Sequence, residues 1–251
     1  MLRSVEDLLG YRVRGTDGDL GTVHDFYFDD QNWIIRYLVV DLGGFLSTRR
    51  VLLSTVPLGC PQAEGKVFPV LLTQDQVEQS PPVDVEQPVS RQMEEELHAH
   101  YGWSPYWRLS TPALSGGALA VTESLSEPDK EGEEPTRRND PHLRSIREVR
   151  GYHIQAIDGE IGHVEDFITD DESWNLRYMV VDTRNWLPGR KVLVAPAWIS
   201  DVNWVTRKVY VDLKREVIEK SPEFQPERPI NREYEVRLYD YYGRPSYWTR
   251  L

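Results

Sequence analysis

Histidine and glutamate, the residue types that bind metals and carry protons, gather in one short stretch of the chain. His98 and His100 follow closely on Glu94–Glu96. Two histidines on a helix can chelate one ion when they are four residues apart, whereas residues two apart point about 200° away from each other. A matching stretch later in the chain has Tyr239 and Tyr241 at the two histidine positions. We therefore expect a solvated or interface-forming helix face here, and no metal site.

Three other features could carry chemistry, and each has a simpler structural explanation. The adjacent acids Asp29-Asp30 and Asp170-Asp171 could hold a hard cation or act as acid and base, but adjacent acids in turns commonly accept backbone N–H groups instead. Cys60 is the single cysteine, so one chain can form neither a disulfide nor a thiolate cage. Gly43-Gly44 lacks the rest of a phosphate-binding pattern. We predict no catalytic residue, no cofactor and no metal.

The charge of the chain restricts its partners. Its formal net charge is −12, and such a field repels a nucleic-acid backbone, so we expect no direct nucleic-acid binding. The first residues lack the apolar core of a signal peptide, and no apolar run approaches the ~20 residues that span a bilayer. With one cysteine, this favours a soluble protein of the reducing cytoplasm that does not bind membranes.

Self-comparison shows that the chain is duplicated. Ser4–Trp107 aligns with Ser145–Trp248 without a gap, and about a third of the aligned positions are identical. One segment, Lys66–Phe68, fits Lys208–Tyr210 better after a slip of one residue, which predicts an irregular loop before that strand. The acidic, proline-containing stretch between the copies has the composition of a flexible linker. We expect a first domain at 1–109, a linker at 110–140 and a second domain at 141–251.

Short strands with tight turns dominate the first part of each copy. In the first copy we predict strands at Leu20–Phe28, Trp33–Leu42, Arg49–Leu53 and Val67–Leu72. Alternation in the second of these places one bulky set on the core face: Trp33, Ile35, Tyr37 and Val39. The far end of the opposite face should also be covered, because Leu38 and Val40 are apolar. Asp25 and Arg36, like Asp166 and Arg177, are expected to pair across neighbouring strands.

One helix is predicted near the end of each copy. Arg91–Tyr101 lies between Ser90, a good N-cap residue, and Gly102, which suits the left-handed position after a helix. Asn231, Arg232–Tyr242 and Gly243 repeat the pattern. Each helix has an apolar stripe at four-residue spacing, which should cover a barrel of its own or of the other copy.

The series Gly10-Tyr11, Asp17–Gly21, Asp25-Phe26 and Trp33–Asp41, present in both copies, resembles the PRC-barrel family over roughly 3–80 and 144–221. The resemblance implies an all-β fold: two small PRC-type β-barrels, each followed by a short C-terminal α-helix and an aromatic tail. It implies a domain that docks onto other macromolecules and has no catalytic residues. Related domains occur in the H subunit of photosynthetic reaction centres and in a bacterial ribosome-maturation factor.

The aromatic tails are the strongest functional signal, because tyrosine and tryptophan are enriched among interface anchors. The candidate interaction residues are Tyr101, Trp103, Tyr106, Trp107, Tyr241, Tyr242, Tyr247 and Trp248. They either pack on the chain's own barrels or bind an external protein or a second copy in a homodimer. The leading hypothesis is a non-catalytic protein-binding or scaffolding module, and the resemblance adds a stress-related role. The alternatives are a ribosome- or RNA-processing-associated assembly factor and an electron-transfer or photosynthetic accessory protein.

Overall fold

The computed structural model describes residues 1–43, 49–83, 89–108, 142–183 and 190–249, so the predicted linker at 110–140 lies outside the described residues. The first copy contains β1 (Leu2–Ser4), α1 (Val5–Leu8), β2 (Arg12–Arg14), β3 (Asp19–Asp29), β4 (Ile34–Asp41), β5 (Arg50–Ser54), β6 (Val67–Pro69), α2 (Gln74–Glu78), α3 (Arg91–Tyr101) and a 3₁₀ turn at Tyr106–Arg108.

The second copy repeats this order and adds one strand, β12, and a 3₁₀ turn before it. It contains β7 (Leu143–Ser145), α4 (Ile146–Val149), β8 (His153–Ala156), β9 (Gly159–Asp170), β10 (Leu176–Asp182), β11 (Lys191–Val194), a 3₁₀ turn at Pro196–Trp198, β12 (Ile199–Asn203), β13 (Lys208–Val211), α5 (Arg215–Glu219) and α6 (Arg232–Tyr242). The short helices α1, α2, α4 and α5 were not predicted from the sequence.

Each copy is built on one sheet, which confirms a mainly β fold. The first sheet runs β5-β4-β3-β2-β6 and the second runs β11-β10-β9-β8-β13-β12. The pairs β2–β6 and β8–β13 are parallel, and the other neighbours in these two paths are antiparallel. Within the described residues the two end strands of each path do not pair with each other, so the closed barrel that the sequence suggested is not seen. In both copies the longest strand, β3 or β9, lies at the centre of the pairing.

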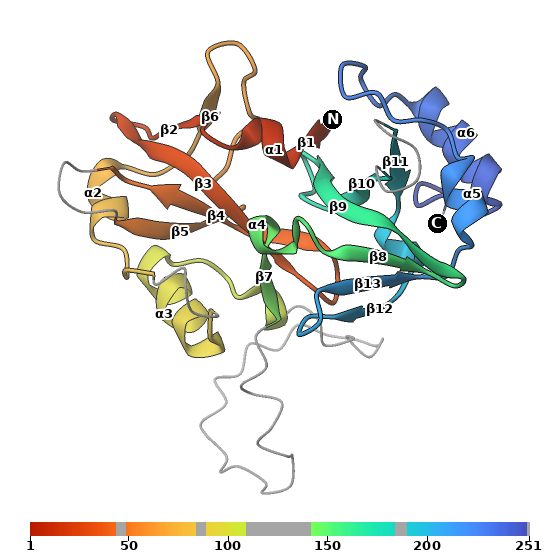
Figure 1. Cartoon of the computed structure of the whole chain (residues 1–251). Coiled ribbons are helices and arrows are strands. Elements are labelled where there is room, and N and C mark those ends of the chain that lie inside the picture. The colour runs from red at the N-terminus through yellow and green to blue at the C-terminus, as the bar shows by residue number, and fades with distance from the viewer. Residues whose placement is uncertain (44–48, 84–88, 109–141, 184–189, 250–251) are drawn as a thin grey trace, which may run out of the picture.

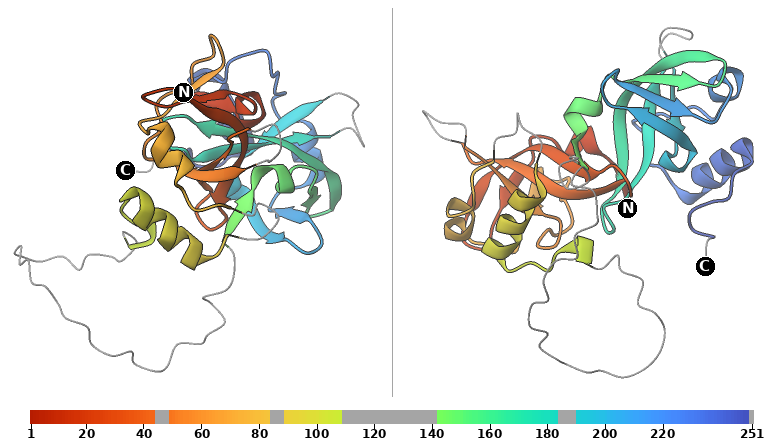
Figure 2. Two further views of the ribbon diagram at one scale, coloured as in Figure 1. Left: turned by 90° about the vertical axis from the view of Figure 1, so that its left-hand side faces the viewer. Right: turned by 90° about the horizontal axis from the view of Figure 1, so that it is seen from below.

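The two copies exchange their first strands. β1 pairs with β9 of the second copy, and β7 pairs with β3 of the first. Figures 1 and 2 show the copies side by side, with α1 and α4 between them. Across the same contact Ile35 N donates to Trp174 O at 2.9 Å and Leu176 N donates to Trp33 O at 2.8 Å. The chain therefore closes on itself with an approximate twofold relation between its halves.

One hydrophobic core runs through both copies. The ring centroids of Phe28 and Phe167 lie 5.9 Å apart, and those of Phe68 and Trp174 lie 5.7 Å apart. All four rings belong to the cluster of buried residues that extends from one sheet to the other. Because apolar burial is the main favourable contribution to folding, each copy depends on the other for part of its stability.

The predicted core face of β4 is wrong in part, because the strand contains a β-bulge. Between the pairs Tyr37–Tyr27 and Ile35–Phe28 the strand contains one extra residue, Arg36. The bulge reverses the alternation of side chains, because two residues of β4 oppose one of β3. The predicted face therefore divides: Ile35 packs in the main core with Leu38 and Val40, whereas Tyr37 and Val39 belong to a smaller cluster with Leu97 of α3. The predicted burial of Leu38 and Val40 is confirmed.

The predicted one-residue slip between the copies is wrong. Lys66 and Arg207 both have a positive φ, of 49° and 55°. Their carbonyl groups accept equivalent bonds, from Arg12 N in the first copy and His153 N in the second, both at 2.9 Å. Lys66 therefore corresponds to Arg207, in agreement with the ungapped alignment. The similar residue types one position along misled the comparison.

The two long helices have the predicted bounds. Ser90 and Asn231 accept the backbone N–H groups of Met93 and Tyr234. Gly102 and Gly243 end the helices in the left-handed conformation. Each helix packs on the sheet of its own copy, and its central leucine, Leu97 or Leu238, is buried in the contact. Among the described helices none is long and apolar enough to cross a membrane.

Candidate functional site

Two buried aspartates lie where the copies exchange strands. Asp25 Oδ2 accepts from Ser145 Oγ at 2.5 Å, and Asp25 Oδ1 accepts from Arg147 N at 3.2 Å. Asp166 repeats both contacts in the other direction, with Ser4 Oγ at 2.5 Å and Glu6 N at 3.0 Å. Each aspartate thus binds the first turn of the other copy's short helix.

Burial raises the pKa of both Asp25 and Asp166 to about 6, although the hydrogen bonds oppose this shift. The predicted pairing of Asp25 with Arg36 and of Asp166 with Arg177 is wrong, because these carboxylates face the other copy. Arg36 instead contacts Asp29 at 3.0 Å, and Arg177 contacts Asp170 at 3.5 Å.

The two acids of each adjacent pair make different contacts. Asp29 accepts the N–H groups of Gln31 and Asn32, as expected for an acid in a turn. Burial alone would raise the pKa of Asp29, but bonds from Asn32 and Arg36 lower it. The second acid of each pair binds an arginine of the other copy: Asp30 contacts Arg144 at 2.8 Å and Asp171 contacts Arg3 at 2.5 Å.

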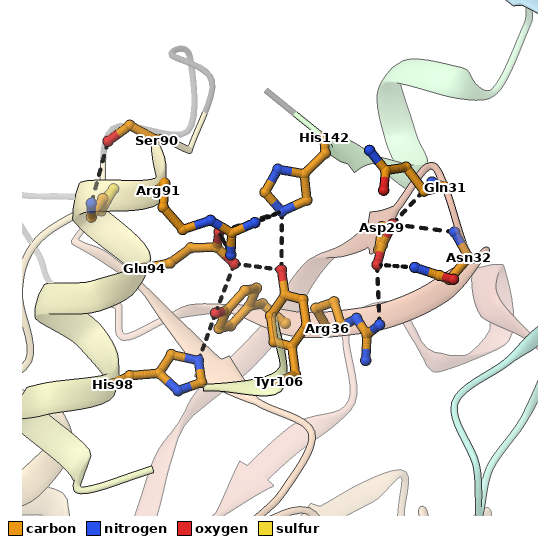
Figure 3. Close-up of polar contacts among 12 residues, drawn as sticks. Asp29, Gln31, Asn32, Arg36, Ser90, Arg91, Glu94, His98, Tyr106 and His142 are labelled. Atoms are coloured by element: carbon orange, nitrogen blue, oxygen red, sulfur yellow. Dashed lines mark hydrogen bonds and ion pairs between the residues drawn. The ribbon is translucent and has the colours of Figure 1, made fainter. Parts of the chain in front are cut away.

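The side chain of one glutamate of α3 is buried between this helix and the sheet of the first copy (Figure 3). Glu94 is 0% exposed, and its Oε1 accepts the hydroxyl groups of Tyr37 at 3.0 Å and Tyr106 at 2.7 Å. Its Oε2 lies 2.8 Å from Arg91 Nη1. We call Glu94, Arg91, Tyr37 and Tyr106 the first carboxylate clasp. It joins β4, α3 and the aromatic tail.

The second copy contains the same arrangement. Glu235 accepts from Tyr178 at 2.8 Å and from Tyr247 at 2.9 Å, and it lies 3.1 Å from Arg232. These four residues form the second carboxylate clasp, and every one of them corresponds to the same residue type in the first. Two hydroxyls and one guanidinium compensate the cost of burying the charge.

Arginine side chains hold the tails against their own domains. Arg36 lies over the ring of Tyr106 at 4.1 Å, and Arg91 lies over Trp107 at 4.2 Å. The second copy repeats both contacts, Arg177 over Tyr247 at 4.0 Å and Arg232 over Trp248 at 4.1 Å. Guanidinium–ring stacking of this kind stabilises by about 1 kcal/mol where the site is partly buried.

The chain was also compared with known proteins. Residues 2–76 match the family model of the PRC-barrel domain. This part of the chain is a PRC-barrel domain. The match confirms, for residues 2–76, the family to which the sequence motifs pointed, and it suggests a small protein-interaction module. None of the curated proteins compared with the chain matches it.

Around the PRC-barrel domain, the first clasp has two histidines that the second lacks. His98 Nε2 lies 2.9 Å from the Tyr37 hydroxyl, and His142 Nε2 lies 2.9 Å from Arg91 Nη2. Figure 3 shows His142 directed toward Arg91 and Tyr106. His142 Nε2 also lies 3.1 Å from the Tyr106 hydroxyl and 3.4 Å from Glu94 Oε2, so its role as donor or acceptor depends on the tautomer of the ring. Burial lowers the pKa of both histidines and raises that of Glu94.

The expected solvated helix face is therefore wrong for Glu94 and His98, whereas His100 is exposed as expected. His98 has Tyr239 as its counterpart, which packs under the tail with its ring 5.1 Å from Trp248. Among the described residues no group of three histidine, cysteine or acidic side chains could hold a metal ion.

The candidate interaction residues lie mainly against their own copy. Tyr242 is buried and Tyr241 is 40% exposed. The remaining six are half-buried: Tyr101, Trp103, Tyr106, Trp107, Tyr247 and Trp248. The structure brings Tyr106 and Trp107 together with the first clasp, and Tyr247 and Trp248 with the second. Binding of a partner by these residues stays a prediction.

Sequence reasoning missed the clasp glutamates and the exchange of first strands. The clasp glutamates had a signal in the repeat. Arg91, Glu94 and Tyr106 keep their types in the second copy although most of the surrounding helix changes. Ser4 and Ser145, each followed three residues later by an acid, are also sequence signatures of a helix start.

Proposed function

We propose that this protein is a non-catalytic interaction module in which two PRC-type domains form a single-chain pseudo-dimer. The observation that carries the proposal is the use of the buried ionisable groups. Glu94 and Glu235 each bind two tyrosines and an arginine, and Asp25 and Asp166 each cap a helix of the other copy. A catalytic group has to reach a substrate, whereas these carboxylates are buried and already bound.

The duplication supports the same proposal. Both copies contain the same clasp with similar distances, which is expected if the clasp fixes the helix and tail on the sheet. Side chains needed for one chemical step would be required in only one copy. The second domain follows the element order and the hydrogen bonding of the first, so we assign it to the same family.

The test combines affinity capture with an assay for turnover. The tagged full-length chain should retain one or a few proteins from an extract of its source cells, and these should be displaced by excess untagged chain. Purified protein, screened against common ester, phosphate, glycoside and redox substrates with and without divalent metals, should show no turnover. Turnover that disappears in a Glu94→Gln variant that still folds would refute the proposal.

The homodimer that the sequence suggested is untested. Because the duplicated chain supplies both halves of the strand exchange, we propose that it is a monomer, and light scattering should then give a mass near the 29.2 kDa of one chain. A mass of twice that value would show that a further surface mediates self-association.

A further inference from the structure

A groove of about 540 Å³ lies in the second copy between α6 and the segment 220–230. Pockets of this size accommodate a small ligand or a few residues of a peptide. Tyr234, Arg237 and Tyr241 line it from one face of α6, as their spacing of three and four residues requires. Facing them are Phe224, Arg228 and Ile230, among others.

The aromatic wall of this groove is fixed in place. The hydroxyl of Tyr234 donates to Pro222 O at 3.2 Å, and that of Tyr241 donates to Val217 O at 2.9 Å. Both tyrosines are therefore anchored at their polar ends while their rings line the groove. A preformed wall reduces the entropy that a ligand loses on binding.

Positive charge predominates around the groove. Arg190, Lys220, Arg228 and Arg237 line it, against one acid, Glu223. Two of these cations have structural partners: Arg190 donates to Ser221 O, and Lys220 pairs with Glu216 at 2.5 Å. The described residues offer Arg228 and Arg237 no carboxylate within ion-pair distance. Arg237 lies over the ring of Tyr234 at 5.4 Å.

Comparison of the copies shows that the fold does not require this charge. The clasp residues are identical in both copies, whereas nine of the thirteen groove residues differ, and Arg190 is among the four that do not. Where the second copy has Lys220, Arg228 and Arg237, the first has Gln79, Gln87 and Glu96. Where the second has Phe224, Tyr234 and Tyr241, the first has Val83, Met93 and His100. The second copy thus has cations and rings at positions where the first has other residue types.

We propose that this groove binds an acidic peptide segment of a partner protein, with carboxylates on Arg228 and Arg237 and an apolar side chain against the tyrosine wall. This inference rests on the proposed function and names the chemistry of the partner. Guanidinium groups bind carboxylates through paired hydrogen bonds, and aromatic rings form the usual anchor surface of interfaces. The chain as a whole has a net charge of −12 and repels acidic ligands, so this locally positive groove is where one would dock.

The test uses the full chain and a fluorescein-labelled peptide of sequence Glu-Asp-Phe-Glu-Asp-Leu, with Gln-Asn-Phe-Gln-Asn-Leu as the uncharged control. Fluorescence anisotropy should show saturable binding of the acidic peptide and at least tenfold weaker binding of the neutral one. Binding should weaken between 50 and 300 mM salt because the contacts are exposed to solvent.

Two double variants of equal charge locate the site. Arg228→Glu with Arg237→Glu should weaken binding at least tenfold. Arg207→Glu with Lys214→Glu, at exposed positions of the second copy outside the groove, should change it less than threefold. Circular dichroism and thermal unfolding of both variants check that they fold.

Equal loss in both double variants, or no binding of the acidic peptide by the wild type, would overturn this inference. Either result would leave the proposed function standing. The proposed function fails if turnover is found or if affinity capture retains no displaceable protein. The two conclusions can therefore fail separately.

Discussion

The contribution of Asp25 and Asp166 to stability should fall as the pH rises from 4.5 to 7.5, because both are buried where the two copies exchange strands. Their pKa is about 6 in the folded protein, against 3.8 for an ordinary aspartate. The folded state therefore holds these protons more tightly than the unfolded state does. The resulting stabilisation is complete below pH 3.8 and is lost as the pH rises through about 6.

The size of the effect follows from the pKa difference. Between pH 4.5 and the folded pKa of about 6, each unit of pH changes the free energy of unfolding by about 1.4 kcal/mol per carboxyl. Each aspartate should thus contribute about 2 kcal/mol over this range, and the two together about 4 kcal/mol. Burial lowers the pKa of His98 and His142, which gives the opposite slope near pH 6, so wild type and variant must be compared at each pH.

The assay is urea unfolding followed by tryptophan fluorescence at pH 4.5, 5.5, 6.5 and 7.5. An Asp25→Asn/Asp166→Asn variant keeps an oxygen for the backbone N–H groups and removes the titration. The difference in unfolding free energy, wild type minus variant, should fall by about 4 kcal/mol across the range. Asp17→Asn with Asp158→Asn is the matched control, because these exposed aspartates also bind a helix N-terminus in both copies. A difference that stays constant with pH for the buried pair would refute the reasoning.

Two further predictions concern single positions. Glu235→Ala should lower the free energy of unfolding by about 3 kcal/mol, because two tyrosine hydroxyls and an arginine lose their partner. Glu233→Ala, on the exposed face of the same helix, should lower it by less than about 0.5 kcal/mol. Similar losses for both variants in thermal unfolding would show that the clasp does not stabilise the fold. Gly21→Ala should lower the free energy of unfolding by about 3 kcal/mol, since the added Cβ would collide with the carbonyl oxygen of Asp41 and φ is +145°. Gly10→Ala should lower it by about 1 kcal/mol, since its φ is +76° and nothing lies within 4 Å of the added Cβ. Equal melting temperatures for the two variants would contradict this.

Local signals explain what the sequence made predictable. The bounds of α3 and α6 follow from a capping side chain at one end and a glycine at the other, and both act within a few residues. The repeat and the family motifs predict a β fold because each copy repeats the same turns. Ser90 and Gly102 were sufficient to place α3 to the residue.

Long-range pairing explains what the sequence did not make predictable. β1 has three residues, Leu2–Ser4, and nothing local states which sheet such a short strand joins. The bulge at Arg36 depends on the register with β3, and both faces of β4 are apolar, so alternation alone assigned Tyr37 to the wrong side.

The clasps were missed for a different reason. A glutamate on a helix is expected at the surface, and Glu94 is buried only because Tyr37, Tyr106 and Arg91 converge on it from three separate segments. Comparison of the two copies, position by position, carried this information, because the clasp residues stay the same while their neighbours change.

Cleavage of the chain between the copies tests the central claim, that each copy completes the other's sheet and shares its core. A protease site introduced within 110–140 would allow the purified protein to be cut and then examined by size-exclusion chromatography with light scattering, without denaturant. The account predicts that the two fragments elute together with the 29.2 kDa mass of the intact chain, because the exchanged strands and the continuous core do not depend on the linker. Separation into two fragments that each remain folded and monomeric would contradict it.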